Sequence, residues 1–316
     1  MMSAVRERVI QFGHGKSLIG ILTTSRGASG DLPHVVIVNA GIIHRVGPNR
    51  LYVDMARAVA AHGYPVLRFD LAGIGDSDST RGGASLTDSA MHDVRAAMDH
   101  LAATRSATRF LVFGLCSGAN YAAMVAFSDP RVVGIMLIDP TVGRTRRSMT
   151  VHVVRRLRNL STLRELALLR HPVFRRSLGR RTNAAMSVAQ AAEGQSGQNA
   201  NVVAPSMSQD GARRALEELI GRGVHMMLLF TGGVNHVYNY HGQLFDLLPG
   251  LDFRGLLRLH YMPETDHTVS DLTGRERFLA LLADWLQHAF PQSGPADVTP
   301  AARATGADGS HAGSPA

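Results

Sequence analysis

The apolar residues of this chain follow two patterns that take turns along most of its length. Continuous apolar runs such as residues 34–39 are typical of buried strands, whereas the four-residue spacing of Leu51, Met55 and Val59 is typical of a helix. Such alternation is typical of a mostly parallel sheet with helices on both faces. The sequence therefore predicts an α/β fold with strands over residues 8–12, 18–23, 34–39, 64–70, 109–114, 132–139, 224–230 and 256–261.

The alternation stops after residue 140 and resumes near residue 220. Between these points apolar residues recur at helical spacing with arginines among them, and residues 190–211 are rich in Gln, Asn, Ser and Gly. After residue 290 the chain is rich in Pro, Ala, Gly and Ser, which is typical of disorder. We expect a core in two parts, residues 1–140 and 221–290, an arginine-rich helical cap at 141–220 and a disordered tail at 291–316.

Charge changes this picture mainly in the expected cap. The net charge of the chain is +8, and twelve arginines but only one acidic residue, Glu165, lie between Arg144 and Arg181. Such a block favours an anionic partner, although a solvated helix face or a peripheral membrane surface gives the same pattern. We expect no nucleic-acid partner, because no nucleic-acid-binding motif accompanies the charge.

Several features of the chain bear on its location. No run of about 18 apolar residues occurs, so the sequence predicts no transmembrane segment. The first residues lack the apolar region of a secretory signal. The chain has 1 cysteine, which excludes an internal disulfide. We therefore expect a cytoplasmic protein.

The single cysteine lies where a strand is expected to meet a helix, in the segment Phe-Gly-Leu-Cys-Ser-Gly-Ala that starts at residue 113. A nucleophile on such a sharp turn needs small residues two positions before and two positions after it, because larger side chains would collide with the neighbouring strand and helix. Gly114 and Gly118 meet this need if Cys116 is the nucleophile. If Ser117 were the nucleophile, Leu115 would occupy a position that requires a small residue. The spacing therefore favours Cys116 over Ser117, and over a thiol that only fills the core.

This turn and three further segments resemble the α/β-hydrolase superfamily. Residues 70–77 are similar to the Asp-x-x-Gly-x-Gly-x-Ser turn after the fourth strand, residues 39–42 occupy the place of the oxyanion loop after the third strand, and residues 266–268 follow the last strand, where the superfamily keeps its histidine. The resemblance implies an eight-stranded sheet with a helical cap, and a cysteine nucleophile in a Gly-x-Cys-x-Gly turn. Residues 39–50 also resemble hydrolases associated with bacterial exosortase systems.

The resemblance implies a role for each of four groups around the turn. Cys116 would be the nucleophile, and His267 would accept its proton and later return it, with His260 as the second candidate. The backbone N–H groups of Ile42 and Ser117 would form the oxyanion hole that stabilises the negative charge of the intermediate.

The residue that orients the histidine is left open by the sequence. Superfamily members usually carry an acid after the strand that follows the cap, and here that segment contains none. Asp139, at the end of the preceding expected strand, is the first candidate, and Asn235 is the alternative. Arg45 and Arg50 in the oxyanion loop could hold a substrate carboxylate, or only pair with acids and cap a helix. No histidine pair has metal-binding spacing, so we expect no metal and no cofactor.

A cysteine nucleophile restricts the substrates that we expect. Its acyl intermediate is a thioester, which is more activated than an ordinary ester or amide, so the substrate should be an activated acyl group such as a thioester or lactone. The sequence therefore predicts an acyl hydrolase or acyltransferase. The acyl group could be carried on an acyl carrier protein or on coenzyme A, because the negative charge of either carrier would suit the arginine block. Two alternatives stay open: a dedicated acyltransferase to an amine or alcohol, and a non-catalytic hydrolase-like binding protein.

Overall fold

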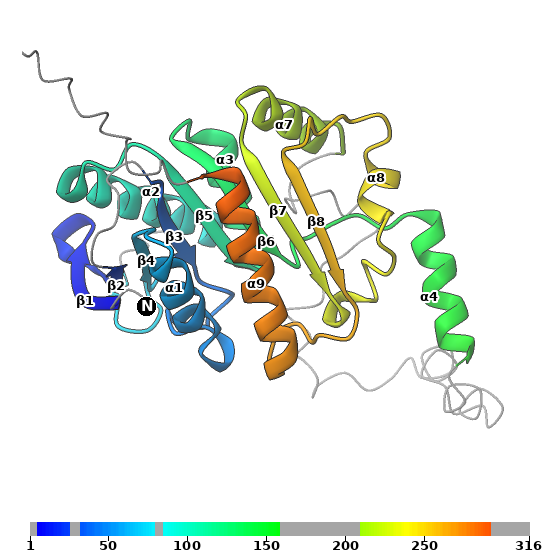
Figure 1. The fold of residues 1–316 in the computed structure, drawn as a ribbon, viewed down its shortest axis with the longest axis horizontal. Helices are drawn as coiled ribbons and strands as arrows, with labels where there is room; N and C mark the ends of the chain where they lie inside the picture. Colours follow the sequence, from blue (N-terminus) through cyan, green and yellow to red (C-terminus); the bar gives the residue numbers. More distant parts are fainter. Residues whose placement is uncertain (1–4, 26–31, 80–84, 159–208, 292–316) are drawn as a thin grey trace, which may run out of the picture.

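An eight-stranded sheet runs through the molecule (Figure 1). The computed structural model describes residues 5–25, 32–79, 85–158 and 209–291. Strands β1 and β2 pair antiparallel, as do β2 and β4, and all later neighbours pair parallel. This confirms the predicted fold class. In their order across the sheet, the strands are β1 (Val5–Phe12), β2 (Leu18–Ser25), β4 (Val66–Phe69), β3 (His34–Val38), β5 (Phe110–Leu115), β6 (Val132–Ile138), β7 (His225–Thr231) and β8 (Leu257–Met262).

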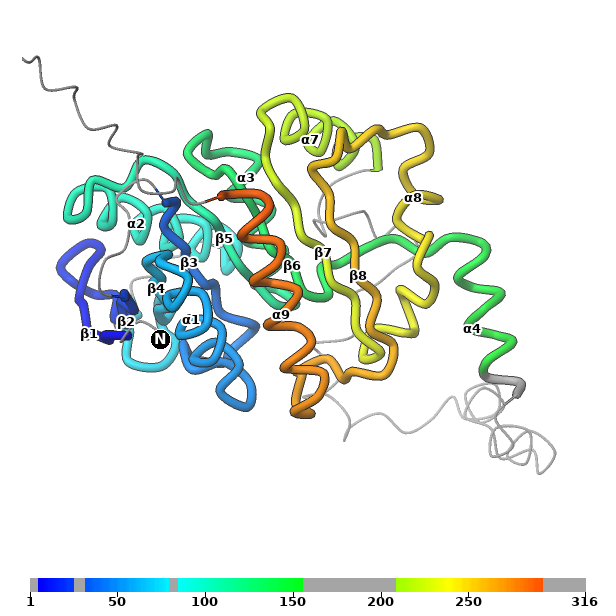
Figure 2. The backbone as a smooth tube through the Cα atoms, in the orientation of Figure 1, coloured from blue at the N-terminus to red at the C-terminus, as the bar shows by residue number. Residues whose placement is uncertain are grey.

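Helices cover both faces of the sheet. Successive residues of a strand point to opposite faces, and apolar side chains on both faces are buried under helices. Along β5, Leu111 and Phe113 belong to one buried cluster with α1 and α9, while Phe110 and Val112 belong to a second cluster with α2, α3 and α7. Figure 2 shows α4 standing apart from the sheet. The helices are α1 (Leu51–Ala61), α2 (Leu86–Arg105), α3 (Ser117–Ser128), α4 (Arg146–Arg158), α7 (Gln209–Gly221), α8 (Gln243–Leu247) and α9 (Leu272–Ala289).

The expected cap is described only at its two ends. Residues 159–208 and the tail after residue 291 lie outside the described residues. Helix α7, which the sequence grouped with the cap, buries Ala212, Leu216 and Leu219 in the same cluster as α3. Its apolar residues fall on one helical face, and that face packs against the sheet layer. In the structure helix α7 therefore packs as part of the layer that covers the sheet.

The parallel register brings the ends of four strands to one edge of the sheet. Leu115 pairs with Ile138, Ile138 pairs with Leu229, and Thr231 pairs with Met262. The segments that follow β5, β6, β7 and β8 therefore begin side by side, although they come from distant parts of the sequence. Open parallel sheets bind their ligands at this carboxyl edge.

Candidate active site

Cys116 forms the sharp turn between β5 and α3. Its backbone has φ 57° and ψ −120°, a conformation that side-chain-bearing residues rarely adopt and that is found at functional turns. A Cβ atom at Gly114 would overlap the carbonyl oxygen of Gly118, and a Cβ at Gly118 would overlap that of Asn39. Only glycine fits at these two positions, and the exposed thiol is thereby presented at the edge of the sheet.

His267 lies between Cys116 and Asp139. Its Nδ1 atom is 2.7 Å from the Asp139 carboxylate, and its side chain also hydrogen-bonds the thiol of Cys116. Because Nδ1 faces the carboxylate, Nε2 is the nitrogen left to face the thiol. The structure thus brings together three of the residues selected from the sequence, in the geometry of a nucleophile, a base and an orienting acid.

Asp139 is held by a residue that the sequence did not single out. Its side chain is fully buried, and it accepts hydrogen bonds from the backbone N–H of Thr231 at 2.7 Å and from the Thr231 hydroxyl at 2.6 Å. Thr231 ends β7, the strand after which superfamily members usually carry their acid. A threonine at that place gives no signal in the sequence, because its hydroxyl acquires this partner only through the pairing of β6 with β7.

The electrostatics of the cluster favour a charged Cys116–His267 pair. The hydrogen bond with His267 lowers the pKa of the Cys116 thiol, and the Ser117 N–H adds to this, while burial and the charge of Asp139 oppose it. The hydrogen bonds with Asp139 and then with Cys116 raise the pKa of His267 against the opposing effect of burial. A thiolate is therefore available below the usual titration range of cysteine.

Alkylation of Cys116 by iodoacetamide should show this shift. Only the thiolate reacts, so we expect the reaction to persist at pH values below the ordinary cysteine pKa of about 8.5 and to be lost as the pH falls through the lowered pKa. The His267→Ala variant lacks the hydrogen bond, and its alkylation midpoint should move to higher pH. Rates measured by intact mass from pH 5 to 10 test this, and equal midpoints for the two proteins would contradict it.

The loop after β3, where the sequence predicts an oxyanion-hole donor, is hydrogen-bonded to the turn at Cys116. A turn is closed by the Ile43 N–H, which donates to Ala40 O at 2.9 Å, and the Gly41 N–H donates to the Ser117 hydroxyl at 2.7 Å. Among the described residues, the Ile42 N–H has no hydrogen-bond acceptor. The side chain of Ser117 thus ties this loop to the turn at Cys116, a contact that was not expected from the sequence.

Two other candidates have partners of their own. The Asn235 side chain accepts a hydrogen bond from Tyr261 Oη at 2.6 Å, and no contact of Asn235 with His267 is found among the described residues. The guanidinium of Arg45 forms ion pairs with Asp70 and, at 2.5 Å, with Asp76. These contacts favour the interpretation of Arg45 as a residue that stabilises its loop.

Arg50 and His260 lie in different surroundings. Arg50 is exposed and precedes α1 with φ 65°. His260 lies on β8, where burial lowers its pKa, and the described part of the chain gives no contact between it and Cys116. The described residues also contain no group of three or more His, Cys, Asp or Glu side chains placed so that they could hold a metal ion. None of the described helices is long and apolar enough to cross a membrane.

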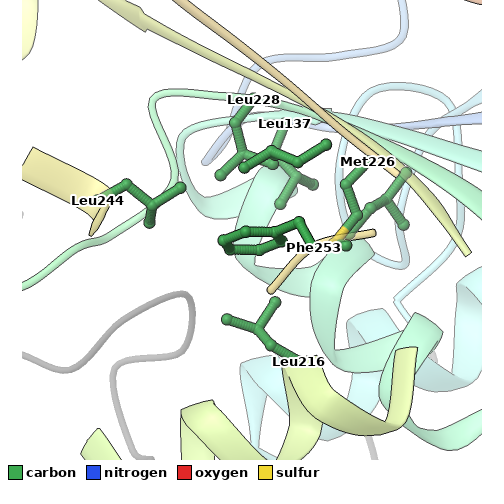
Figure 3. Close-up of a pocket in the computed structure, with 8 residues that line it drawn as sticks. Leu137, Leu216, Met226, Leu228, Leu244 and Phe253 are labelled. Atoms are coloured by element: carbon green, nitrogen blue, oxygen red, sulfur yellow. The ribbon is translucent and has the colours of Figure 1, made fainter. Parts of the chain in front are cut away.

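An apolar cavity lies away from this cluster, beneath α7 and α8 (Figure 3). No titratable side chain lines it, so it offers no chemistry of its own. It is a packing gap on the face of the sheet that α3 and α7 cover. Its lining residues are Ile135, Leu137, Leu216, Met226, Leu228, Leu244, Phe253 and Leu257.

Comparison with known proteins agrees with this fold. A family model described as serine aminopeptidase, S33, matches residues 33–217. The chain belongs to the serine aminopeptidase S33 family. It is thus an α/β hydrolase, as the resemblance implied. The description of the S33 family names a serine, whereas the turn residue here is Cys116, with Ser117 next to it.

Solved structures share the fold with this S33 family member at low sequence identity. A proline iminopeptidase from Mycobacterium smegmatis is 17% identical over 90% of this chain and 98% of its own, with a TM-score of 0.53. An esterase from Pyrococcus furiosus is 10% identical over 90% and 91%, with a TM-score of 0.54. A serine hydrolase without lid from Xanthomonas campestris is 14% identical over 92% and 97%, with a TM-score of 0.52. No curated protein sequence matches the chain.

Proposed function

We propose that this α/β hydrolase acts on activated acyl groups through a thioester on Cys116. In the first step the thiolate attacks the acyl carbonyl carbon, and the N–H groups of Ile42 and Ser117 stabilise the oxyanion. When the intermediate collapses, the leaving group takes the proton from the His267 imidazolium. In the second step, water or another acceptor gives its proton to His267, attacks the thioester and releases the thiolate. Asp139 keeps Nδ1 protonated, so that Nε2 can carry out both transfers.

The observation that carries this proposal is the contact of His267 with both Cys116 and Asp139. A thiol that only filled the core would need neither partner. The same contacts argue against the alternative of a non-catalytic binding protein, because a buried carboxylate aimed at a histidine that faces an exposed thiol serves proton transfer.

The thioester intermediate guides the proposed substrate class. Attack of a thiolate on another thioester is nearly balanced in free energy, whereas attack on an ordinary amide is uphill. We therefore expect acyl thioesters, lactones or activated esters as substrates. A dedicated acyltransferase is the second candidate function, because a persistent thioester also suits attack by an amine or alcohol.

The proposed acyl donor is carried on an anionic group. Arg144, Arg146 and Arg147 are exposed on the segment that follows β6, the strand that leads into Asp139. These arginines favour the phosphates of coenzyme A or an acidic carrier protein as the donor. Two further proposals rest on the sequence alone. They are a cytoplasmic location and a relation to hydrolases associated with bacterial exosortase systems.

Intact-mass measurement tests the nucleophile. Incubation with p-nitrophenyl acetate should add one acetyl group to the wild-type protein and none to Cys116→Ala. The Ser117→Ala variant should still be acetylated, but more slowly, because Gly41 loses its hydrogen-bond acceptor. An adduct that survives in Cys116→Ala and disappears in Ser117→Ala would assign the reaction to the serine. The absence of any adduct on the folded wild-type protein would contradict the acyl-enzyme mechanism.

A further inference from the structure

Two loops that meet beside Cys116 both contain backbone in the left-handed region. The first, residues 39–50, carries the Ile42 N–H and ends with Asn49 at φ 48° and Arg50 at φ 65°. The second, residues 263–271, carries His267 and contains Val269 at φ 50°. Such conformations are unfavourable for residues with a side chain, above all for a β-branched valine, and persist only where surrounding contacts impose them.

The side chain of Arg275 in α9 contacts both of these loops. From Nε and Nη2 it donates to the carbonyl oxygen of Val269 at 3.2 and 3.1 Å. From Nη1 it donates to the carbonyl oxygen of Asn49 at 2.9 Å and to the carboxylate of Asp54 at 2.9 Å. The side chain is only 12% exposed, so these bonds are largely shielded from water. The planar guanidinium thereby fixes the distance between the two strained carbonyl groups.

Other contacts hold the histidine loop without Arg275. The Asp266 carboxylate accepts hydrogen bonds from the N–H groups of Thr268 at 2.7 Å and Ser270 at 3.0 Å, and Asp139 holds the imidazole itself. The oxyanion loop has a weaker link to the histidine loop, since Asn49 Nδ2 lies 3.3 Å from Thr268 Oγ1. The loop of residues 39–50 is also held at Gly41 by Ser117 and at Arg45 by its acidic partners. Loss of Arg275 should therefore release the end of this loop at Asn49 more than it displaces His267.

We propose that Arg275 is a positioning residue that sets the place of the oxyanion loop relative to the Cys116–His267 pair. The inference rests on the proposed acyl transfer through Cys116. It adds a side chain that connects the loop of residues 39–50 to the loop of residues 263–271. The guanidinium then has a function beyond helix packing. The carbonyl groups of Asn49 and Val269 that it joins belong to the loop with the proposed oxyanion donor and to the loop with the proposed base.

Arg277, two residues later on the same helix, provides a matched control. Its guanidinium pairs with Glu264 at 2.5 Å, but both side chains are more than half exposed, at 57% and 58%. It contacts neither Asn49 nor Val269 among the described residues. Arg277→Gln therefore removes the same charge from α9 as Arg275→Gln and leaves the link between the loops intact.

The test compares two reactions of Cys116. Acetylation by p-nitrophenyl acetate needs the oxyanion hole, whereas alkylation by iodoacetamide needs only the thiolate. For Arg275→Gln we expect acetylation to slow by about 10- to 100-fold, in line with the cost of a small misplacement, and alkylation to change by less than about twofold. Arg275→Lys should fall between, and Arg277→Gln should match the wild type in both reactions.

Hydrogen–deuterium exchange separates this inference from the proposed function. Amides of residues 39–50 should exchange faster in Arg275→Gln than in Arg277→Gln, whether or not the protein accepts acyl groups. Unchanged exchange and unchanged acetylation would overturn the role of Arg275, as would an equal fall of acetylation and alkylation. Faster exchange in this loop, combined with no acetylation of the wild-type protein, would support the role of Arg275 in holding the loop and would contradict the acyl-enzyme mechanism.

Discussion

Replacing Asp139 by Asn is expected to lower kcat/KM for an activated ester by about a thousandfold while the protein stays folded. An asparagine of the same shape presents an N–H to His267 Nδ1 and so favours the tautomer that carries its proton on Nε2. That nitrogen then cannot accept the proton of Cys116. The fold should tolerate the change, because the amide oxygen still accepts from the Thr231 N–H and the Thr231 hydroxyl can turn to accept from the amide nitrogen.

The control for this prediction is Asn235→Ala, because Asn235 was the other candidate from the sequence. Its side chain is bound to Tyr261 rather than to His267, so we expect kcat/KM to change by less than about threefold. Both variants should be measured with p-nitrophenyl acetate, and their thermal unfolding followed by circular dichroism. A large loss of activity in Asn235→Ala together with a small one in Asp139→Asn would reverse the assignment.

Replacing Gly118 by Ala is expected to destabilise the protein by about 3 kcal/mol or more. The added methyl group would overlap Asn39 O and lie 2.8 Å from Val38 O, so β3 and α3 would have to move apart. For a protein of this size the loss corresponds to a fall in Tm of about 5–10 °C. Thermal unfolding measured by calorimetry or circular dichroism tests the prediction.

Gly221→Ala serves as the matched control for Gly118→Ala. A Cβ at Gly221, at the end of α7, meets no atom within 4 Å, and the position is exposed. We expect its free energy of unfolding to stay the same or to rise by up to about 1 kcal/mol, because alanine is the better helix former. Equal Tm values for the two variants would mean that the turn around Cys116 can relax, contrary to the packing described above.

The inner strands were predictable because each one is marked by an apolar run, which the partly polar edge strand β1 lacks. The runs at 34–39 and 132–139 became β3 (His34–Val38) and β6 (Val132–Ile138), with ends that differ by one residue. The packing of helix α7 was not predictable, because the sequence shows that a helix is amphipathic but not what covers its apolar face. Only the tertiary packing of Leu216 and Leu219 against the sheet layer reveals this.

The candidate site was predictable as far as local rules reach. Gly114 and Gly118 pointed to Cys116, because the sharp turn requires small residues two positions before and after it. This steric requirement involves only a few neighbouring residues, so the sequence shows it directly. The partner of His267 was left open, since it depends on the register between β6 and β7 and on the loop after β8. The contacts of Thr231 and Arg275 depend on side chains that meet only in the folded chain, and neither residue type marks its role in the sequence.

The distance along the chain between the members of the cluster has a consequence for biosynthesis. Asp139 and His267 are 128 residues apart, and the pKa of the thiol depends on the later of the two. A nascent chain that has passed Cys116 but not yet folded the segment after β8 therefore carries an ordinary thiol. We therefore expect the enhanced reactivity of this thiol to appear only when the last loop docks, so that the rate of its alkylation would follow completion of the fold.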